Sequence, residues 1–167
     1  GIVCTTSKID KNNVIDYLNF PERIYPVGRL DKESTGLLLL TNNGQLMDDI
    51  LRGSNYHEKE YIVHVNKPIT DSVLQAMAQG VPILDTITRP CKIRRMGKDC
   101  FYITLTQGLN RQIRRMCEYF DYRVTSLKRI RIMNIELGSL PVGKWRELTP
   151  SEIKTLKNLA QNKGEAE

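Results

Sequence analysis

The sequence predicts an α+β fold in which a mainly antiparallel sheet is flanked by helices. Segments with the two-residue alternation of strands outnumber segments with helical spacing, and the two kinds do not alternate strictly along the chain. This order favours α+β over a doubly wound parallel sheet. The length of 167 residues suits one domain, with room for two sub-layers around its core.

The N-terminal third is expected to hold two strands and two helices. Residues 1–6 (GIVCTT) have the composition of a short strand, and residues 12–19 carry an apolar helical stripe that ends before a proline. Residues 36–41 (GLLLLT) form a continuous apolar run, which is typical of a strand buried on both faces. Residues 42–54 have the spacing of an amphipathic helix, with Gly53 as its C-terminal cap.

The middle of the chain is predicted to consist mostly of strands. Residues 58–67 alternate between polar and apolar side chains, and Tyr61 lies on the apolar face. Residues 70–80 form a helix for which Thr70 is the N-cap. Residues 81–106 again have the pattern of strands.

The C-terminal third contains two predicted helices around a strand region. Residues 110–120 form a helix in which an apolar stripe is flanked by arginines, and residues 124–137 resemble strands. Residues 149–161 give the clearest helical signal, because Thr149 and Glu152 have the spacing of a capping box.

Basic side chains are concentrated in residues 89–131. This segment holds twelve basic and three acidic residues, a net charge of +9 against +6 for the whole chain. A concentrated positive surface favours a polyanionic partner, of which nucleic acid is the commonest. The alternative is a solvated surface that serves only solubility.

The composition argues against several classes of protein. The four cysteines lack C-x-x-C spacing and there are only two histidines, so we expect no zinc site and the reduced thiols of a cytoplasmic protein. No apolar run approaches the roughly 18–20 residues that span a membrane, and the start lacks the layout of a signal peptide. The chain has no initiator Met and begins in a predicted strand, which indicates a piece of a longer protein.

One acidic residue precedes the leucine run. In GRLDKESTG (28–36), Asp31 lies between two glycines that permit tight turns. Taken alone, Asp31 is best interpreted as a turn or cap carboxylate paired with Arg29 or Lys32. The other interpretation is a nucleophile or general base at the mouth of a buried strand.

Two further segments carry candidate functional side chains. Tyr61 is either a core or edge aromatic, or a ring that stacks on a base or approaches a reacting proton. In QGLNRQIRRM (107–116), Arg111 and Arg115 share a helical face and are expected to be solvated, whereas Arg114 lies beside the apolar stripe. A buried arginine usually has a carboxylate partner, so Arg114 is less readily interpreted as a merely solvated side chain.

Together these segments resemble the RsuA-type branch of the pseudouridine synthases. The resemblance rests on GRLDKESTGLLLLTNNG, EKEY and QGLNRQIRRM, and GIVCTT and GKWRELTPSE extend it over nearly the whole chain. The segments VPILDTITRPCKI and RIRIMNIELGSLPVGKWREL are most similar to the RluF type, which modifies large-subunit ribosomal RNA. The resemblance implies a pseudouridine synthase fold, with residues 1–167 as the catalytic domain.

The resemblance also implies roles for individual residues. Asp31 matches the catalytic aspartate, Tyr61 the active-site tyrosine and Arg114 the basic residue that pairs with the aspartate. We therefore expect Asp31 and Arg114 at ion-pairing distance on the floor of a basic cleft, with Tyr61 beside them. Arg29 matches an arginine that helps to hold the RNA after the uridine is flipped out, and Leu127 is our choice for the side chain that packs on the flipped base.

The implied activity is the isomerisation of one uridine to pseudouridine in a stem-loop of large-subunit ribosomal RNA. Arg111 and Arg115 are expected to contact that RNA. The reaction has no redox or phosphoryl step, so we expect no metal and no cofactor. Asp31 acts either as a nucleophile at C1′ or C6, or by assisting elimination to a glycal. We expect a cytoplasmic monomer without membrane contact. Family members normally carry an N-terminal S4-type RNA-binding module, which has no counterpart in this sequence.

Other interpretations remain open. One is that the chain is a non-catalytic RNA-binding module that uses its basic segment for affinity. Another is that it is a sister synthase that acts on another ribosomal RNA site. A structural protein of the ribosome would explain the charge but would leave Asp31 without a task.

Overall fold

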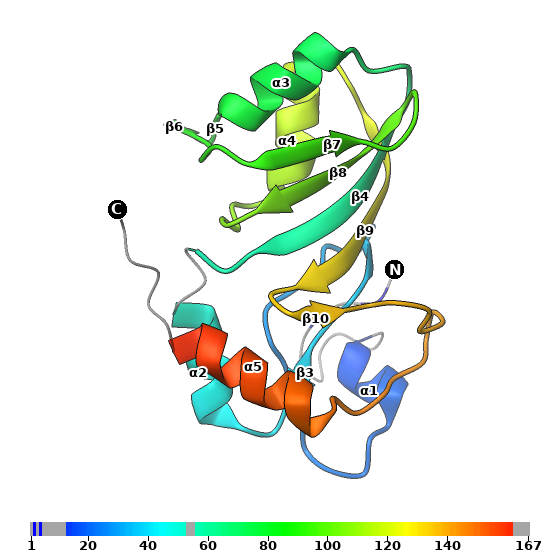
Figure 1. Ribbon diagram of the computed structural model, residues 1–167. Helices are drawn as coiled ribbons and strands as arrows, with labels where there is room; N and C mark the ends of the chain where they lie inside the picture. Colours follow the sequence, from blue (N-terminus) through cyan, green and yellow to red (C-terminus); the bar gives the residue numbers. More distant parts are fainter. Residues whose placement is uncertain (1, 3, 5–12, 53–55, 162–167) are drawn as a thin grey trace.

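The chain forms one central sheet with helices packed at both of its ends (Figure 1). The computed structural model describes residues 2, 4, 13–52 and 56–161. The helices are α1 (Val14–Leu18), α2 (Gly44–Arg52), α3 (Asp71–Gln79), α4 (Gln112–Tyr119) and α5 (Pro150–Gln161). The strands are β1 (Tyr25–Pro26), β2 (Thr35–Gly36), β3 (Leu40–Thr41), β4 (Lys59–Val65), β5 (Pro82–Ile83), β6 (Thr86–Ile87), β7 (Lys92–Arg95), β8 (Cys100–Leu105), β9 (Val124–Ile132) and β10 (Ile135–Glu136).

The central sheet confirms the predicted α+β class and antiparallel pairing. Its strands run in the order β10–β9–β4–β8–β7, and each pair of neighbours is antiparallel. Only the short strand β2 joins the described part of this sheet in parallel, where Thr35 pairs with Lys128 and Gly36 with Arg129 of β9. The strand pairs β1–β3 and β5–β6 lie outside the central sheet.

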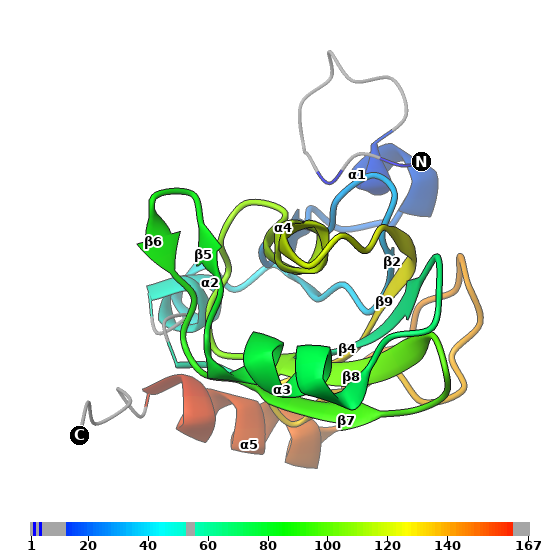
Figure 2. The same ribbon diagram turned by 90° about the horizontal axis from the view of Figure 1, so that it is seen from above.

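One face of the sheet forms the larger core together with α3 and α4. Val63, Phe101 and Leu127 point to this face from three adjacent strands, and Met77 and Met116 reach it from the two helices. Full burial of each such side chain contributes roughly 1.5–3 kcal/mol. Seen from above, α4 lies on one side of the sheet and α5 on the other (Figure 2).

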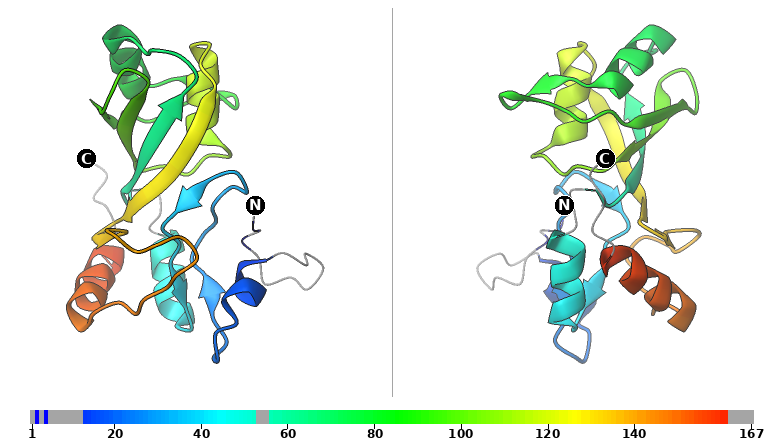
Figure 3. Two further views of the ribbon diagram at one scale, coloured as in Figure 1. Left: turned by 90° about the vertical axis from the view of Figure 1, so that its right-hand side faces the viewer. Right: turned by 60° about the vertical axis from the view of Figure 1, so that its left-hand side comes forward.

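A second core lies at the other end of the sheet. Leu37 and Leu39 pack there against Ile50 of α2, Ile135 of β10 and Leu156 of α5. Figure 3 shows α2 and α5 side by side beneath the end of β9. The chain of 167 residues thus builds two hydrophobic cores, one on a face of the central sheet and one at its end.

The predicted N-caps of two helices, Thr70 and Thr149, are confirmed by their hydrogen bonds. Thr70 Oγ1 accepts a bond from the backbone N of Val73 at 3.2 Å. Thr149 Oγ1 accepts from the N of Glu152 at 3.1 Å, and the Glu152 carboxylate accepts from the N of Thr149 at 2.9 Å. Each capping bond satisfies a backbone donor that the helix itself leaves free. The predicted cap at Gly53, and all but Ile2 and Cys4 of the predicted first strand, lie outside the described residues.

The expectation of a continuous strand over residues 36–41, buried on both faces, is wrong. Leu37 and Leu39 are buried, but the side chains between and after them are only half buried. The backbone N of Leu37 donates to the carbonyl of Arg129 in β9, whereas the carbonyl of Leu39 accepts from the N of Val27. The run therefore crosses from one sheet to another, and neither sheet covers its second face.

None of the described helices is both long and apolar enough to cross a membrane. The four cysteines all carry free thiols. Burial raises the pKa of Cys91 to about 11 and that of Cys117 to about 12. These two thiols stay protonated at neutral pH, so they are poor nucleophiles.

The start of α5 predicts a specific loss of stability in acid. Two hydrogen bonds of 2.8 Å from Arg146, together with the backbone N of Thr149, lower the pKa of Glu152 from 4.5 to about 2. Because the folded pKa is the lower one, the stabilisation is complete above pH 4.5 and is lost as the pH falls toward 2. Glu152→Gln keeps the capping geometry but removes the charge, so we expect a loss below about 1 kcal/mol at pH 7.

Urea unfolding at several pH values measures this difference. The free energies of unfolding of the wild type and Glu152→Gln should converge as the pH falls from 4.5 toward 2. Glu136→Gln, an exposed change on the neighbouring strand β10, serves as the control. A gap between wild type and Glu152→Gln that stays constant with pH would show that the ion pair does not stabilise the fold.

Candidate active site

The loop that carries Asp31 is closed by contacts at its two ends. Gly36 has a φ of +111°, and a side chain there would collide with the backbone of Arg129. Gly28 also has a positive φ, of +80°. Only glycine adopts such angles without strain, so the predicted glycine turns are confirmed. Between them, the N of Ser34 donates to the carbonyl of Asp31 at 2.9 Å in a turn.

Helix α4 packs against this loop through two arginines. Arg114 Nη2 donates to the Ser34 hydroxyl at 3.4 Å. Arg111 forms an ion pair of 3.2 Å with Glu33. The backbone hydrogen bond of Glu33 and its bonds with Arg111 lower the pKa of this carboxyl, and the charge of Arg114 lowers it further. The basic helix and the Asp31 loop are therefore neighbours, as the sequence predicts.

The expected ion pair between Asp31 and Arg114 is not formed. Within residues 13–52 and 56–161, no contact of 4.0 Å or less joins the two charged groups. Arg114 reaches Ser34 instead, three residues after Asp31, while its Nε is buried without a hydrogen-bond partner. The carboxylate of Asp31 is half exposed. An ion pair between them would therefore need a movement of the loop or of the guanidinium.

The other predicted arginines have different surroundings. Arg115, which we expected to be solvated, is half buried and bonds the backbone and side-chain oxygens of Asn110, both at 2.9 Å. Arg111 is likewise half buried and paired with Glu33. Arg29 is exposed at the start of the Asp31 loop. Arg29 therefore has the most accessible side chain of the three for binding RNA.

Tyr61 and Leu127 share the inner face of the sheet. Tyr61 lies in β4, pairs with Arg129 of β9 and packs, half buried, against the larger core. Leu127 pairs with Val63 and is 6% exposed, so its side chain belongs mainly to that core. The predicted role of Leu127 beside a flipped base stays a prediction.

Arg129 is the residue that the sequence reasoning missed. Its side chain is 4% exposed, and its Nε donates to the carbonyl of Leu37 at 2.8 Å. Its Nη1 donates to the carbonyl of Arg29 at 3.5 Å. Arg129 thus bonds both ends of the Asp31 loop while it pairs with the strand that carries Tyr61. The sequence did offer one indication of its burial. Arg129 lies two residues after the apolar Leu127, and alternate residues of a strand share a face.

A β-bulge directs Arg129 toward the site. The pairing of β4 with β9 shifts between Glu60 and Tyr61, so that Glu60 pairs with Arg131 and Tyr61 with Arg129. Ile130 is the extra residue, so Arg129 and Arg131, which would share a face in a regular strand, point to opposite faces here. Bulges are frequent beside active sites because they redirect a side chain in this way.

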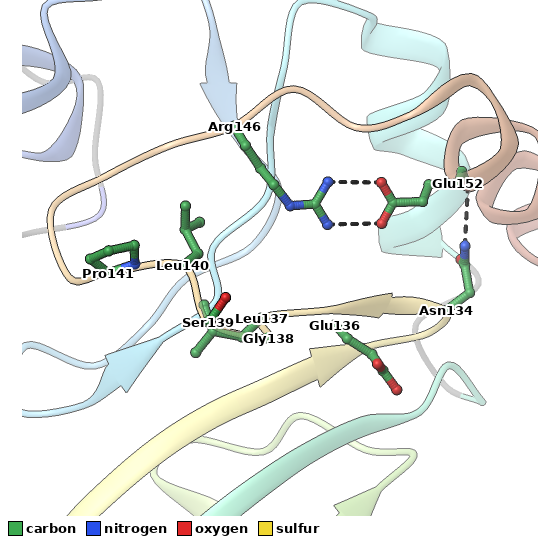
Figure 4. Close-up of a pocket in the computed structure, with 9 residues that line it drawn as sticks. All are labelled: Asn134, Glu136, Leu137, Gly138, Ser139, Leu140, Pro141, Arg146 and Glu152. Carbon is green, nitrogen blue, oxygen red and sulfur yellow. Dashed lines mark hydrogen bonds and ion pairs between the residues drawn. The ribbon is translucent and has the colours of Figure 1, made fainter.

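A hollow of about 540 Å³ lies away from the Asp31 loop, between β10 and the start of α5 (Figure 4). At its edge Arg146 donates two bonds of 2.8 Å to the Glu152 carboxylate, and Asn134 Nδ2 donates to the carbonyl of Glu152 at 3.1 Å. None of the predicted site residues lines this hollow. Its side chains hold the start of α5 in place, so we propose no catalytic role for this hollow.

The described residues contain no recognisable cluster of metal-binding side chains. No group of three or more His, Cys, Asp and Glu side chains is placed to hold an ion in that part of the chain. The site contains the carboxylates of Asp31 and Glu33, the phenol of Tyr61 and several guanidinium groups on the loop, the sheet and α4.

Comparison with known proteins identifies the class to which this fold and site belong. Residues 1–119 match the family model described as RNA pseudouridylate synthase. A crystal structure of a pseudouridylate synthase superposes with a TM-score of 0.86 at 30% identity, covering 93% of this chain and 69% of the other. The chain belongs to the RNA pseudouridylate synthase family.

Individual relatives narrow this likeness. The chain is 54% identical over 161 residues to the dual-specificity RNA pseudouridine synthase RluF of Salmonella typhi, covering 96% of this chain and 56% of that protein. It is 34% identical over 169 residues to the ribosomal large subunit pseudouridine synthase B of Bacillus subtilis, covering 96% of this chain and 69% of that protein. The chain thus spans about half the length of the RluF relatives, and the predicted likeness to the RluF type is confirmed.

The close approach at Gly36 yields a prediction about stability. Gly36→Ala places a Cβ against the backbone of Arg129 at a positive φ, so we expect a loss of about 2 kcal/mol or more in the free energy of unfolding. Gly44→Ala is the matched control, because no atom lies within 4 Å of its added Cβ. Urea unfolding of the two variants measures the difference. Equal stability of both variants would contradict the close approach of β2 to β9.

Proposed function

We propose that the chain isomerises uridine to pseudouridine in ribosomal RNA, with Asp31 as the catalytic carboxylate. The observation that carries this proposal is the packing of α4 on the Asp31 loop, where Arg114 bonds Ser34 and Arg111 pairs with Glu33. Family membership and the names of the relatives support the same reaction. The loop, the sheet and the basic helix then form the three sides of one site.

The chemistry is balanced without an external reagent. The C1′–N1 bond breaks, the detached uracil turns, and a C1′–C5 bond forms. C5 loses a proton and N1 gains one, so no electrons enter or leave. Asp31 acts as nucleophile at C1′ or C6, or assists elimination to a glycal. Tyr61 stacks on the base or accepts the C5 proton, since its ring lies on the face of the sheet that holds Arg129.

Arg114 would keep Asp31 ionised and oriented once the two groups meet. An opposite charge within about 4–6 Å favours the ionised form of a carboxyl group. Catalytic contacts are often long before substrate binds and tighten in the complex, so the Ser34 contact is compatible with this role. Leu127 at the edge of the core would pack on the flipped base.

The substrate is proposed to be a stem-loop of large-subunit ribosomal RNA. A uridine in a stem must be flipped out, which costs a few kcal/mol, and phosphate contacts from basic side chains offset that cost. Arg29 is exposed at the mouth of the loop, and residues 89–131 carry a net charge of +9. Arg111 and Arg115 would add phosphate contacts. We further propose that the protein acts as a cytoplasmic monomer.

The test is a substitution that removes the carboxylate without changing its shape. Asp31→Asn should lower pseudouridine formation by at least about 10³-fold, a loss typical of a removed nucleophile. Its affinity for RNA should persist, since an acidic side chain is replaced by a neutral one. Asp48→Asn, an exposed change on α2, is the control and should retain full activity. Carbodiimide primer extension on a large-subunit RNA fragment measures the product.

Each alternative gives a different result. Full activity in Asp31→Asn would refute the role of Asp31. A non-catalytic RNA-binding module would bind the fragment in a salt-dependent way and yield no product even as wild type. A sister synthase would modify a uridine at another ribosomal RNA site, either elsewhere in the large subunit or in the small subunit.

A further inference from the structure

A small cavity lies behind the loop that carries Asp31. Its volume is about 40 Å³, whereas one water-sized occupant needs about 10–15 Å³. Gly28 and Arg29 of the loop line one part of it, and His57, Lys59 and Arg129 supply its basic side chains. The cavity therefore brings together three basic side chains from two strands and the segment before β4.

Two of these side chains have buried nitrogens without partners. Arg129 is 4% exposed, and its Nη2 makes no hydrogen bond. His57 is 7% exposed, and neither of its ring nitrogens has a partner. A buried donor left unpaired costs roughly 1–3 kcal/mol, and more when it is charged. Such groups in a folded protein normally have a bound water or ion.

The cavity also holds positive charge that no acid offsets. In the described ranges, no ion pair of 4.0 Å or less joins Lys59 or Arg129 to a carboxylate. Burial lowers the pKa of Lys59, and the charge of Arg129 lowers it further. Burial, and then the charge of Lys59, likewise lower the pKa of His57, which keeps its ring neutral at pH 7.

The sheet separates the nearby acids from this cavity. Glu58 and Glu60 flank Lys59 in sequence, but they point to the opposite face of the sheet. There they contact Arg131 at 3.1 and 3.8 Å. The bulge at Ile130 leaves Arg129 on the cavity side. The local acids are thus committed to Arg131 and cannot neutralise Lys59 or Arg129.

We propose that this cavity binds one small monovalent anion of the size of chloride. Arg129 Nη2 and a ring N–H of His57 are its donors, and the nearby positive charge of Lys59 strengthens the attraction. A water molecule would satisfy some of these donors but would leave the two cations uncompensated. A phosphodiester group carries two ribose substituents, which a cavity of about 40 Å³ does not hold. The proposal does not depend on the reaction that the chain catalyses.

The anion would complete the bonding of the guanidinium that closes the Asp31 loop. Nε and Nη1 of Arg129 already bond the carbonyls of Leu37 and Arg29, and only Nη2 lacks a partner. An anion on Nη2 would fix the guanidinium plane, and through it both ends of the loop. The site is therefore structural, with its effect directed at the loop.

Bromide, which scatters anomalously, tests the site directly. Crystals of the wild-type chain soaked in sodium bromide should show an anomalous peak at hydrogen-bond distance from Arg129 Nη2 and near Lys59. A peak found only on the protein surface, or a cavity filled by water alone, would overturn the proposal. An RNA phosphate in this position in a complex would equally refute it.

Thermal unfolding tests the site in solution. At equal ionic strength, chloride should raise the unfolding midpoint of the wild type above its value in gluconate, by about 3–5 °C at a tenfold excess of chloride over its Kd. Lys59→Met should lose this chloride-specific rise. Lys128→Met, the same change on the exposed face of β9, should keep it. An equal rise in all three proteins would overturn the proposal, and if Lys59→Met fails to fold, the bromide experiment still decides.

Discussion

The buried guanidinium of Arg129 is the interaction on which the arrangement of the site depends. Its side chain bonds the carbonyls of Leu37 and Arg29, and its backbone carbonyl accepts from the N of Leu37. These bonds tie both ends of the Asp31 loop to the sheet. They also require Gly36, since any side chain there would displace Arg129. The loop therefore takes its position from the sheet together with its own glycines.

The bulge at Ile130 distributes charge between the two faces of the sheet. Outside, Arg131 contacts Glu60 in ordinary ion-pair fashion. Inside, Arg129 lies on the same face as Tyr61 and meets backbone carbonyls in place of a carboxylate. Among the described residues, the positive charge of Arg129 thus stays without a carboxylate partner on the inner face of the sheet, because Glu58 and Glu60 point to the outer face.

Helix α4 completes the site by electrostatic contacts that avoid the key carboxylate. Arg111 pairs with Glu33 and Arg114 contacts Ser34, so both bind residues beside Asp31. Asp31 itself has no charged partner among the described residues, and its carboxylate stays half exposed. A loop that is held through the residues around Asp31 leaves the Asp31 side chain partly accessible.

Local spacing and motifs in the sequence were enough to predict the α+β class, the helix caps at Thr70 and Thr149, and the segments that carry Asp31, Tyr61 and Arg114. Tertiary structure alone decided three things: the break in the leucine run, the missing ion pair between Asp31 and Arg114, and the burial of Arg129. The break arises because residues 37–39 pass between two sheets. The ion pair is missing because Arg114 reaches Ser34 instead, and Arg129 is buried because Leu37 and β2 pack against β9. The partners and the face of a side chain follow from strand register, which contacts distant in sequence set.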